Sequence, residues 1–272
     1  MRDYITQEEI KTFDSSYKVG LVSTIDDKGD PHITLFSTLM AKAANELMVG
    51  NFISGLSTEY MKKRPRCGFL IMTLQRDFWT GRMDYTHMAL NGEEYEHFNS
   101  MPLFRFNTYF GIDSVYYFKL KEISEKRALN MAGVIANALR VMLSRGRFKG
   151  RGCKGALGAW TCELMQKLDT LAFISYIDDE GYPRVIPCIQ LQAADDSTLV
   201  LTNHPYKAEL SAIPKDARVA VFGANLNFET ILMKGKFSGF EGGLGYVAID
   251  RVYNSSPPKH GYVFPPEERI KR

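Results

Sequence analysis

The ten residues "VSTIDDKGDP" (Val22–Pro31) recur as "ISYIDDEGYP" (Ile174–Pro183), and this repeated phrase decides the fold. Matched positions lie 152 residues apart, as Ser23 and Ser175 do (175 − 23 = 152). The same offset, without a gap, relates two further pairs, Asn51 with Asn203 and Arg66 with Arg218. One offset kept over this length indicates an internal duplication of a whole domain, because the period is too long for a solenoid.

Length and composition agree with two ordinary globular domains. The chain has 272 residues, of which 45% are hydrophobic and 24% charged, with a net charge of +3. Its four cysteines form no C-x-x-C pair, so the sequence suggests neither a zinc site nor a disulfide scaffold. The N-terminal segment lacks a signal-peptide core, and no apolar run approaches the roughly 18 residues of a membrane helix. We therefore expect a cytoplasmic protein that binds neither nucleic acid nor membrane.

The repeated phrase predicts a β-hairpin. Val19–Ile25 and His32–Met40 are strand-like, and Asp, Gly and Pro between them supply the turn chemistry. A third strand at Glu46–Asn51 precedes a short helix at 57–65, for which Ser57 is the expected N-cap. The second repeat follows the same order, with a third strand at 198–203 and a helix at 207–215. Three further strands complete each repeat. Six strands and one helix predict a small, mostly antiparallel barrel.

A different kind of segment separates the repeats. Ser124–Ser144 has helical spacing of its apolar residues, which are Ala128, Met131, Ile135, Leu139 and Met142. The Gly-rich basic stretch Arg145–Gly155 predicts an exposed, flexible connector, with a phosphate or nucleic-acid site as the alternative. A second helix is expected over 157–167. We accordingly expect a first barrel at residues 1–122, a helical linker at 123–167, and a second barrel with a C-terminal tail at 168–272.

The order of these pieces resembles a known family. "IDDEGYPRVIPCIQLQ" and "LVLTNHPYKAELSAIPKDARVAVF", with their counterparts "IDDKGDPHITLFSTLM" and "LMVGNFISGLSTEYMKKRPRCGFLI", are similar to the FMN-binding split barrel of pyridoxamine 5′-phosphate oxidase-like proteins. The resemblance implies a mostly β chain with short helices, in which two tandem split β-barrels are joined by a helical linker. It also implies FMN as the cofactor, bound at the seam between two barrels. The vitamin reaction itself does not carry over, because the true oxidases are single-barrel homodimers.

The resemblance points to residues that could hold a flavin phosphate near a helix N-terminus, where unpaired N–H groups favour anions. In the second repeat these are Thr202, Asn203 and Lys207, and in the first they are Asn51, Ser54, Ser57 and Thr58. Gly55 stands where Lys207 stands (207 − 152 = 55), so the first repeat lacks the basic residue. The alternative is that these residues are helix caps and a solvated lysine.

The isoalloxazine slot is expected along the second strand, at Ser37, Thr38, Cys188 and Gln190. Trp79 and Arg82 are further candidates, with a core tryptophan and a carboxylate-paired arginine as alternatives. The aromatic segment Phe104–Phe110, around Arg105, follows an insertion of 15–20 residues and suggests either a lid or a plug for the barrel.

His87, Glu93, Glu94 and His97 lie close together in the chain and are a possible metal site, but a polar surface helix is the preferred interpretation, and no metal is expected.

These residues favour an FMN-dependent oxidoreductase acting on an unidentified small molecule, although no catalytic residue stands out. A flavin carries its own electron chemistry, so the lack of an acid–base pair does not oppose this interpretation. The alternatives are a haem- or deazaflavin-binding split barrel and a non-enzymatic flavin-binding module. We expect one high-affinity FMN per chain with contributions from both repeats, and homodimerisation is compatible with the fold.

Overall fold

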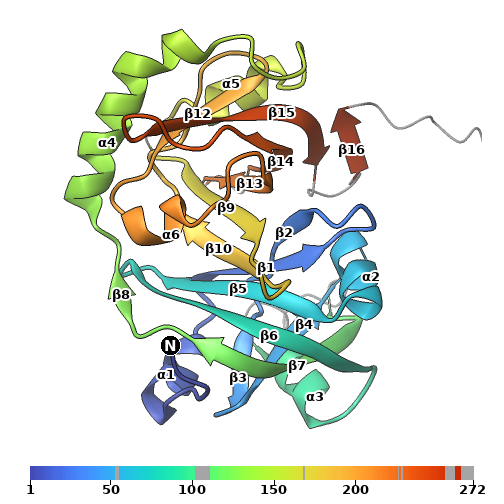
Figure 1. The fold of residues 1–272 in the computed structure, drawn as a ribbon. Helices are drawn as coiled ribbons and strands as arrows, with labels where there is room; N and C mark the ends of the chain where they lie inside the picture. The colour runs from blue at the N-terminus through green and yellow to red at the C-terminus, as the bar shows by residue number, and fades with distance from the viewer. Residues whose placement is uncertain are drawn as a thin grey trace, which may run out of the picture. The chain divides into compact units, whose positions relative to one another are not determined.

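The computed structural model describes residues 1–52, 55–101, 111–167, 169–225, 227, 229–254 and 261–264. It contains two compact units (Figure 1). Unit 1 comprises Met1–Leu129 and Asp179–Val185, and unit 2 comprises Asn130–Asp178 and Ile186–Arg272. None of the helices in the described part of the chain reaches the length and hydropathy that a membrane crossing requires.

The first sheet has the strand order β2-β1-β5-β6-β7-β4-β3, and β8 pairs with β6 outside this path. Its elements are α1 (Gln7–Phe13), β1 (Lys18–Ile25), β2 (Pro31–Leu35), β3 (Met40–Ala43), β4 (Glu46–Asn51), α2 (Leu56–Lys63), β5 (Arg66–Thr73), β6 (Asp77–Ala89), α3 (Glu93–Ser100), β7 (Ser114–Ile123) and β8 (Arg127–Ala128).

The second sheet repeats this order as β10-β9-β13-β14-β15-β12-β11, and β16 pairs with β15 outside the path. Its elements and the helices that precede it are α4 (Met131–Ser144), the 3₁₀ turn η1 (Arg145–Phe148), α5 (Ala159–Leu164), β9 (Leu171–Ile177), β10 (Pro183–Pro187), β11 (Gln192–Ala193), β12 (Thr198–Thr202), α6 (Lys207–Ser211), β13 (Arg218–Ala224), β14 (Thr230–Phe237), β15 (Leu244–Asn254) and β16 (Gly261–Phe264).

Each sheet must curl into a barrel because its two edge strands are close neighbours in the chain. β2 and β3 lie at opposite ends of the strand order, yet only residues 36–39 separate them. Five Cα–Cα steps span at most ~18 Å, whereas six strand spacings in a flat sheet would separate the edges by ~29 Å. The two edge strands are therefore close in space but do not pair with each other by hydrogen bonds. A curled sheet that stays open between its edge strands is a split barrel. β10 and β11 stand in the same relation, with 188–191 between them.

The pairing registers repeat with the offset seen in the sequence. Val22 pairs with Phe69 in the first sheet, and Ile174 pairs with Val221 in the second, each shifted by 152. From β7 onward the offset becomes 129, because Met48 pairs with Tyr117 and Val200 pairs with Tyr246 (246 − 117 = 129). The first sheet therefore contains 23 additional residues between β6 and β7 (152 − 129 = 23), and α3 lies within them.

The expected strand His32–Met40 is wrong as a single strand. The chain turns at Phe36, whose N–H donates to the Gly20 carbonyl at 2.7 Å, and Leu39 N–H then donates to the Phe36 carbonyl at 3.0 Å. The second sheet makes the same turn, where Cys188 N–H donates to the Ala172 carbonyl at 2.8 Å. The turn divides the second predicted strand into β2 and β3, so the six predicted strands become seven.

The helices differ from expectation at their ends. The N-cap of α2 is Gly55 rather than Ser57, which is the second helical residue. The linker helix begins only at Met131, where the Asn130 side chain accepts from Gly133 N–H at 2.9 Å, because Arg127–Ala128 form β8 instead. The basic stretch is not wholly irregular, since it begins with η1 and its backbone N–H groups at Gly150 and Gly155 donate to Asp195 and Asp196.

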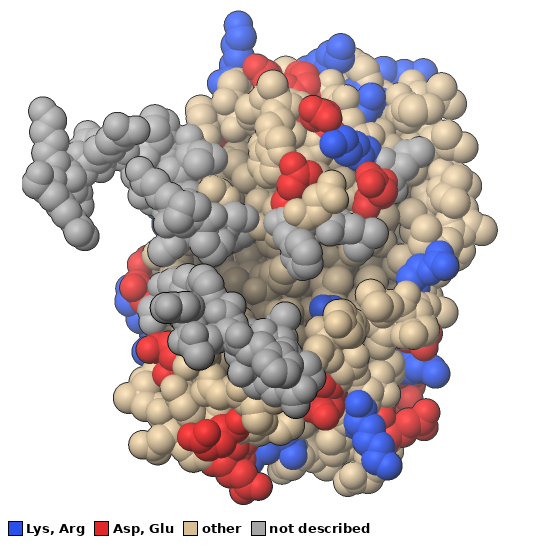
Figure 2. Space-filling view, turned by 180° about the vertical axis from the view of Figure 1, so that it is seen from behind, with Lys and Arg blue, Asp and Glu red and all other residues tan. Residues whose placement is uncertain are grey.

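The core of unit 1 is a continuous apolar cluster inside the curled sheet, and Phe69, Phe118, Met83 and Val115 within it are fully buried. Most charged side chains lie at the surface, although a few, such as Glu9, Asp26 and Lys234, are buried. Figure 2 shows that acidic and basic residues occur together across the drawn face, so neither sign forms a continuous field there.

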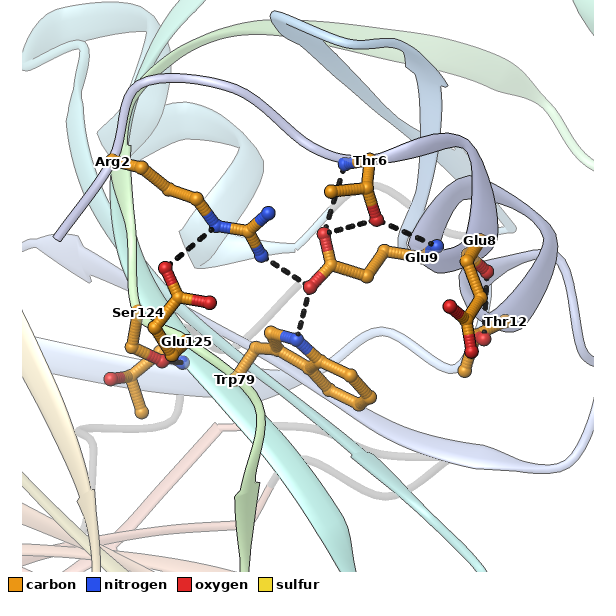
Figure 3. A network of polar contacts seen from close by, with 9 residues as sticks. Arg2, Thr6, Glu8, Glu9, Thr12, Trp79, Ser124 and Glu125 are labelled. Atoms are coloured by element: carbon orange, nitrogen blue, oxygen red, sulfur yellow. Dashed lines mark hydrogen bonds and ion pairs between the residues drawn. The ribbon is translucent and has the colours of Figure 1, made fainter.

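A polar network attaches the N-terminal segment to this core (Figure 3). Thr6 and Glu9 form a capping box at the start of α1, and Arg2 donates to the Glu9 carboxylate. The Trp79 indole N–H donates to the same carboxylate at 2.8 Å, and its ring meets Phe13 edge-on at 5.1 Å between centroids. Burial alone would raise the pKa of Glu9, but the hydrogen bonds from Arg2, Thr6 and Trp79 outweigh it and hold the pKa below its usual value.

We predict that Glu9→Gln lowers the free energy of unfolding of unit 1 by about 1.5–3 kcal/mol at pH 7, the range for hydrogen bonds to a charged group. Because the folded-state pKa of Glu9 is depressed, its contribution is present above the unfolded pKa and is lost as the pH falls through the folded pKa. Urea unfolding should be followed by Trp79 fluorescence in a Trp160→Phe background, at pH 7 and near pH 3. The exposed neighbour Glu8→Gln is the control. An equal loss at both pH values would contradict this assignment.

Candidate cofactor-binding site

The ends of β4 and β12 carry matched polar clusters. In unit 1 the Thr38 hydroxyl donates to the Gly50 carbonyl at 2.6 Å, next to Asn51. In unit 2 the Gln190 side-chain amide donates to the Thr202 carbonyl at 3.0 Å, next to Asn203. The bond in unit 1 connects the turn after β2 to the end of β4, and the bond in unit 2 connects the turn after β10 to the end of β12. The paired residues of the two units correspond at the offset of 152. The structure therefore brings together Thr38 with Asn51, and Gln190 with Thr202 and Asn203. The family resemblance assigns Thr38 and Gln190 to the isoalloxazine slot and the other three residues to the phosphate.

These clusters contain buried polar atoms without partners among the described residues. In unit 1 they are Asn51 Nδ2 and Ser114 Oγ, which belong to a directly opposed pair on β4 and β7. In unit 2 they are Asn203 Oδ1 and Gln190 Oε1. An unsatisfied buried polar atom costs about 1–3 kcal/mol, so water or a ligand is expected at such atoms. Ser114 was not identified from the sequence.

The hydroxyls at the start of α2 are used within unit 1. Ser57 and Thr34 share a hydrogen bond between their hydroxyls, and both Ser57 and Thr58 are buried. The Thr58 hydroxyl accepts from Gly55 N–H at 3.1 Å and donates to the Gly55 carbonyl at 2.7 Å. Ser37 is half-buried in the turn between β2 and β3. Ser54 lies outside the described residues.

We call the strand-end regions around Asn51 in unit 1 and around Asn203 in unit 2 the polar corners. The polar corner of unit 2 carries positive charge. Lys207 is exposed as the first residue of α6, and Thr202 donates from its hydroxyl to the His204 carbonyl at 3.1 Å. Arg140 of α4 donates to the Gly242 carbonyl at 2.6 Å. A Cβ placed on Gly243 would lie 3.2 Å from Asn203 Oδ1 and 3.4 Å from Arg140 Nη1, so the guanidinium reaches the edge of the Asn203 cluster.

Arg140 was not predicted as a site residue, although the sequence carries a signal for it. It is the one charged residue in the fourteen residues of α4. Its hydrogen-bond acceptor, the Gly242 carbonyl, is 102 residues away in the chain (242 − 140 = 102). Only the folded structure places them together.

Three other candidates are engaged in structural contacts. Trp79 is buried in the core, as described above, so its polar atom is satisfied by Glu9. Burial raises the pKa of the Cys188 thiol well above its usual value, so this cysteine stays protonated. Arg82 forms ion pairs with Glu122 at 2.8 Å and with Glu180 at 2.9 Å, which is the carboxylate-paired alternative.

The Arg82 ion pairs belong to a larger network in unit 1. Arg184 also donates to Glu122, and the Tyr182 hydroxyl donates to Asp84 at 2.9 Å. Burial alone would raise the pKa of Glu122, but the hydrogen bonds from Arg82 and Arg184 outweigh it and lower the pKa. Burial, together with the hydrogen bond to Asp84, raises the pKa of Tyr182 to about 12. This network holds the 179–185 hairpin tip within unit 1.

The metal alternative does not assemble. Among the described residues there is no group of three or more His, Cys, Asp or Glu side chains that could hold a metal ion. His87 stacks on Tyr117, and Glu94 pairs with Lys42 at 3.0 Å. The aromatic segment Phe104–Phe110, with Arg105, lies outside the described residues.

No family model matches the chain, and no curated protein matches it. Solved structures resemble about half of it at low identity. An FMN-binding protein from Syntrophomonas wolfei subsp. wolfei is 15% identical with a TM-score of 0.38, and the match covers 45% of this chain and 86% of that one. HupZ of Group A Streptococcus is 14% identical with a TM-score of 0.36, covering 44% and 91%. An F420 reductase is 10% identical with a TM-score of 0.35, covering 44% and 98%. In the order and curling of both its sheets, the chain has the split-barrel fold.

Proposed function

We propose that the chain is an FMN-binding flavoprotein that acts as an oxidoreductase on a small molecule. The observation that carries this proposal is the matched pair of strand-end clusters around Asn51 and Asn203, each with a buried amide atom that lacks a partner in the described structure. Two barrels with the same register keep the same polar corner, although most of the surrounding side chains differ. A ligand requirement at that corner explains why the buried polar atoms persist.

The chemistry of these atoms suits a flavin mononucleotide. FMN presents acceptors at its phosphate and ring carbonyls, and it presents donors at its ribityl hydroxyls and ring N–H. Unit 1 leaves two donors unused, Asn51 Nδ2 and the Ser114 hydroxyl, and unit 2 leaves two acceptors, Asn203 Oδ1 and Gln190 Oε1. Arg140 and Lys207 would supply the charge for the phosphate, because charge-assisted hydrogen bonds are the strong ones.

The two corners are unequal, and this inequality supports placing the phosphate at unit 2. At the Gly50 end of β4, a Cβ would lie 2.9 Å from the Phe98 ring, so α3 covers this corner with an apolar side chain. Gly55 also replaces the lysine of the second repeat. The unit 2 corner has Arg140 and Lys207 instead. The expectation of one high-affinity FMN per chain stays a prediction, and this asymmetry supports it.

When bound, the flavin would supply the electron-transfer chemistry. The chain's own residues would bind and orient it, with cations holding the phosphate and the Asn and Gln amides holding polar edges. The buried thiols of Cys67 and Cys188 do not join this chemistry, because burial raises both of their pKa values and keeps them protonated.

We predict that Lys207→Ala and Arg140→Ala each weaken FMN binding by about tenfold to a hundredfold, since a charge-assisted contact contributes about 1.5–3 kcal/mol. Flavin fluorescence titration measures this directly. Lys215→Ala, an exposed lysine of the same unit, is the matched control and should leave the affinity unchanged. Unchanged binding in both test variants would remove these cations from the site.

We further predict a flavin absorbance spectrum for the protein reconstituted with excess FMN, and close to one flavin released per chain after denaturation. Catalytic turnover with a reduced nicotinamide as the hydride donor should then separate an enzyme from a non-enzymatic flavin-binding module. A ratio near two would contradict the unequal corners. A Soret band on purified protein would favour haem, and the absence of any bound cofactor would overturn the proposal.

A further inference from the structure

Helix α4 presents an apolar face to solvent. Ile135, Leu139, Met142 and Leu143 are 55%, 45%, 44% and 81% exposed. The opposite face, which is buried on β11 and β12, consists of Val134, Ala138 and Val141. The sequence pattern singled out Ile135, Leu139 and Met142 as an apolar stripe of this helix, and the structure shows that this stripe faces outward. A patch of this kind on one short helix marks an interaction surface rather than scattered surface hydrophobics.

The spacing of this face is that of a helix-pairing seam. Positions 132, 135, 139 and 142 of α4 follow each other by three, four and three residues, and they are Ala, Ile, Leu and Met. Alternating steps of three and four are the a and d positions of paired helices. The one charged residue of α4, Arg140, is turned to the Gly242 carbonyl, so no charge lies within the seam.

We propose that a second copy of this chain covers the face, through antiparallel pairing of α4 with α4 about a two-fold axis at Leu139. In that arrangement Ile135 faces Leu143 of the second copy, and Ala136 faces Met142. The large Met142 thus meets the small Ala136 on either side of the central leucine, and Ile135 and Leu143 meet as an apolar pair. The face is complementary to itself, as an isologous interface requires.

The antiparallel direction follows from charge. Five basic residues, and no acidic ones, lie between the end of α4 and residue 155; they are Arg145, Arg147, Lys149, Arg151 and Lys154. Parallel pairing would bring the two basic stretches together. Antiparallel pairing separates them by about the length of α4, ~21 Å for fourteen residues at ~1.5 Å each, which exceeds the Debye length at physiological salt.

The size of the face predicts a weak dimer. The four exposed side chains offer on the order of a few hundred Å² per copy, compared with about 800 Å² per partner in a standard stable interface. Association should therefore depend on concentration in the micromolar range. This proposal does not rest on flavin binding, so the two can fail separately.

Sedimentation velocity at protein concentrations from about 1 to 100 µM tests the proposed dimer. Circular dichroism confirms that each variant is folded. Wild-type protein should shift from monomer to dimer, and Leu139→Asp should raise the dissociation constant at least tenfold. Leu74→Asp, which changes an exposed leucine of unit 1, is the control and should leave the dimer intact. A monomer at every concentration overturns the proposal. Binding of that monomer to phosphatidylserine vesicles would assign the face to a membrane surface instead, and a dimer unaffected by Leu139→Asp would place the interface elsewhere.

Crosslinking tests the geometry. In a Cys153→Ser background, which removes the exposed cysteine, Leu139→Cys should form an intermolecular disulfide with itself. A mixture of Ile135→Cys and Leu143→Cys proteins should crosslink more than either protein alone. Self-crosslinking of Ile135→Cys without the mixed product would overturn the antiparallel arrangement.

Discussion

The rest of each unit depends on one geometric constraint, which is that two edge strands of a seven-strand path are joined by only four residues. The connection is too short to cross a flat sheet, so the sheet must curl until its edges approach each other. The hydrogen bond from Phe36 N–H to the Gly20 carbonyl sets the turn. The same turn carries Thr38 to the end of β4, and its counterpart carries Gln190 to the end of β12. The polar corner is therefore a consequence of barrel closure.

The two barrels have the same strand order and pairing register, but different elements surround the polar corner in each. In the first barrel the extra residues between β6 and β7 build α3, and Phe98 packs against the Gly50 end of β4. In the second barrel that insertion is missing, and α4 brings Arg140 to Asn203 and Gly243 instead. An apolar cover and a cationic edge have opposite consequences for an anionic ligand, because a buried phosphate requires compensating donors and charge. The asymmetry of the proposed site comes from elements outside the repeated ladder.

Much of the charge in unit 1 serves the structure. Glu9 satisfies Arg2 and Trp79 together, and Glu122 accepts from both Arg82 and Arg184. Removing one member of such a partly buried set leaves its partners unpaired, which costs more than the pair contributes. For this reason Trp79 and Arg82, which looked like ligand residues in isolation, are better understood as parts of the scaffold that holds β6 against its neighbours.

The sequence by itself determined the repeat, the offset of 152, and strands such as β4, predicted as Glu46–Asn51 and found there, because alternation and turn residues are local signals that occur twice. It also located Asn51 and Asn203 at matched strand ends. Only the tertiary structure decided where the second predicted strand breaks, since the break depends on a backbone contact with β1. Only the tertiary structure also decided which face of α4 is buried, because this helix carries apolar residues on both faces. No local preference selects the face that is buried, so packing on β11 and β12 selects it, and this packing also turns Arg140 toward residues distant in the chain.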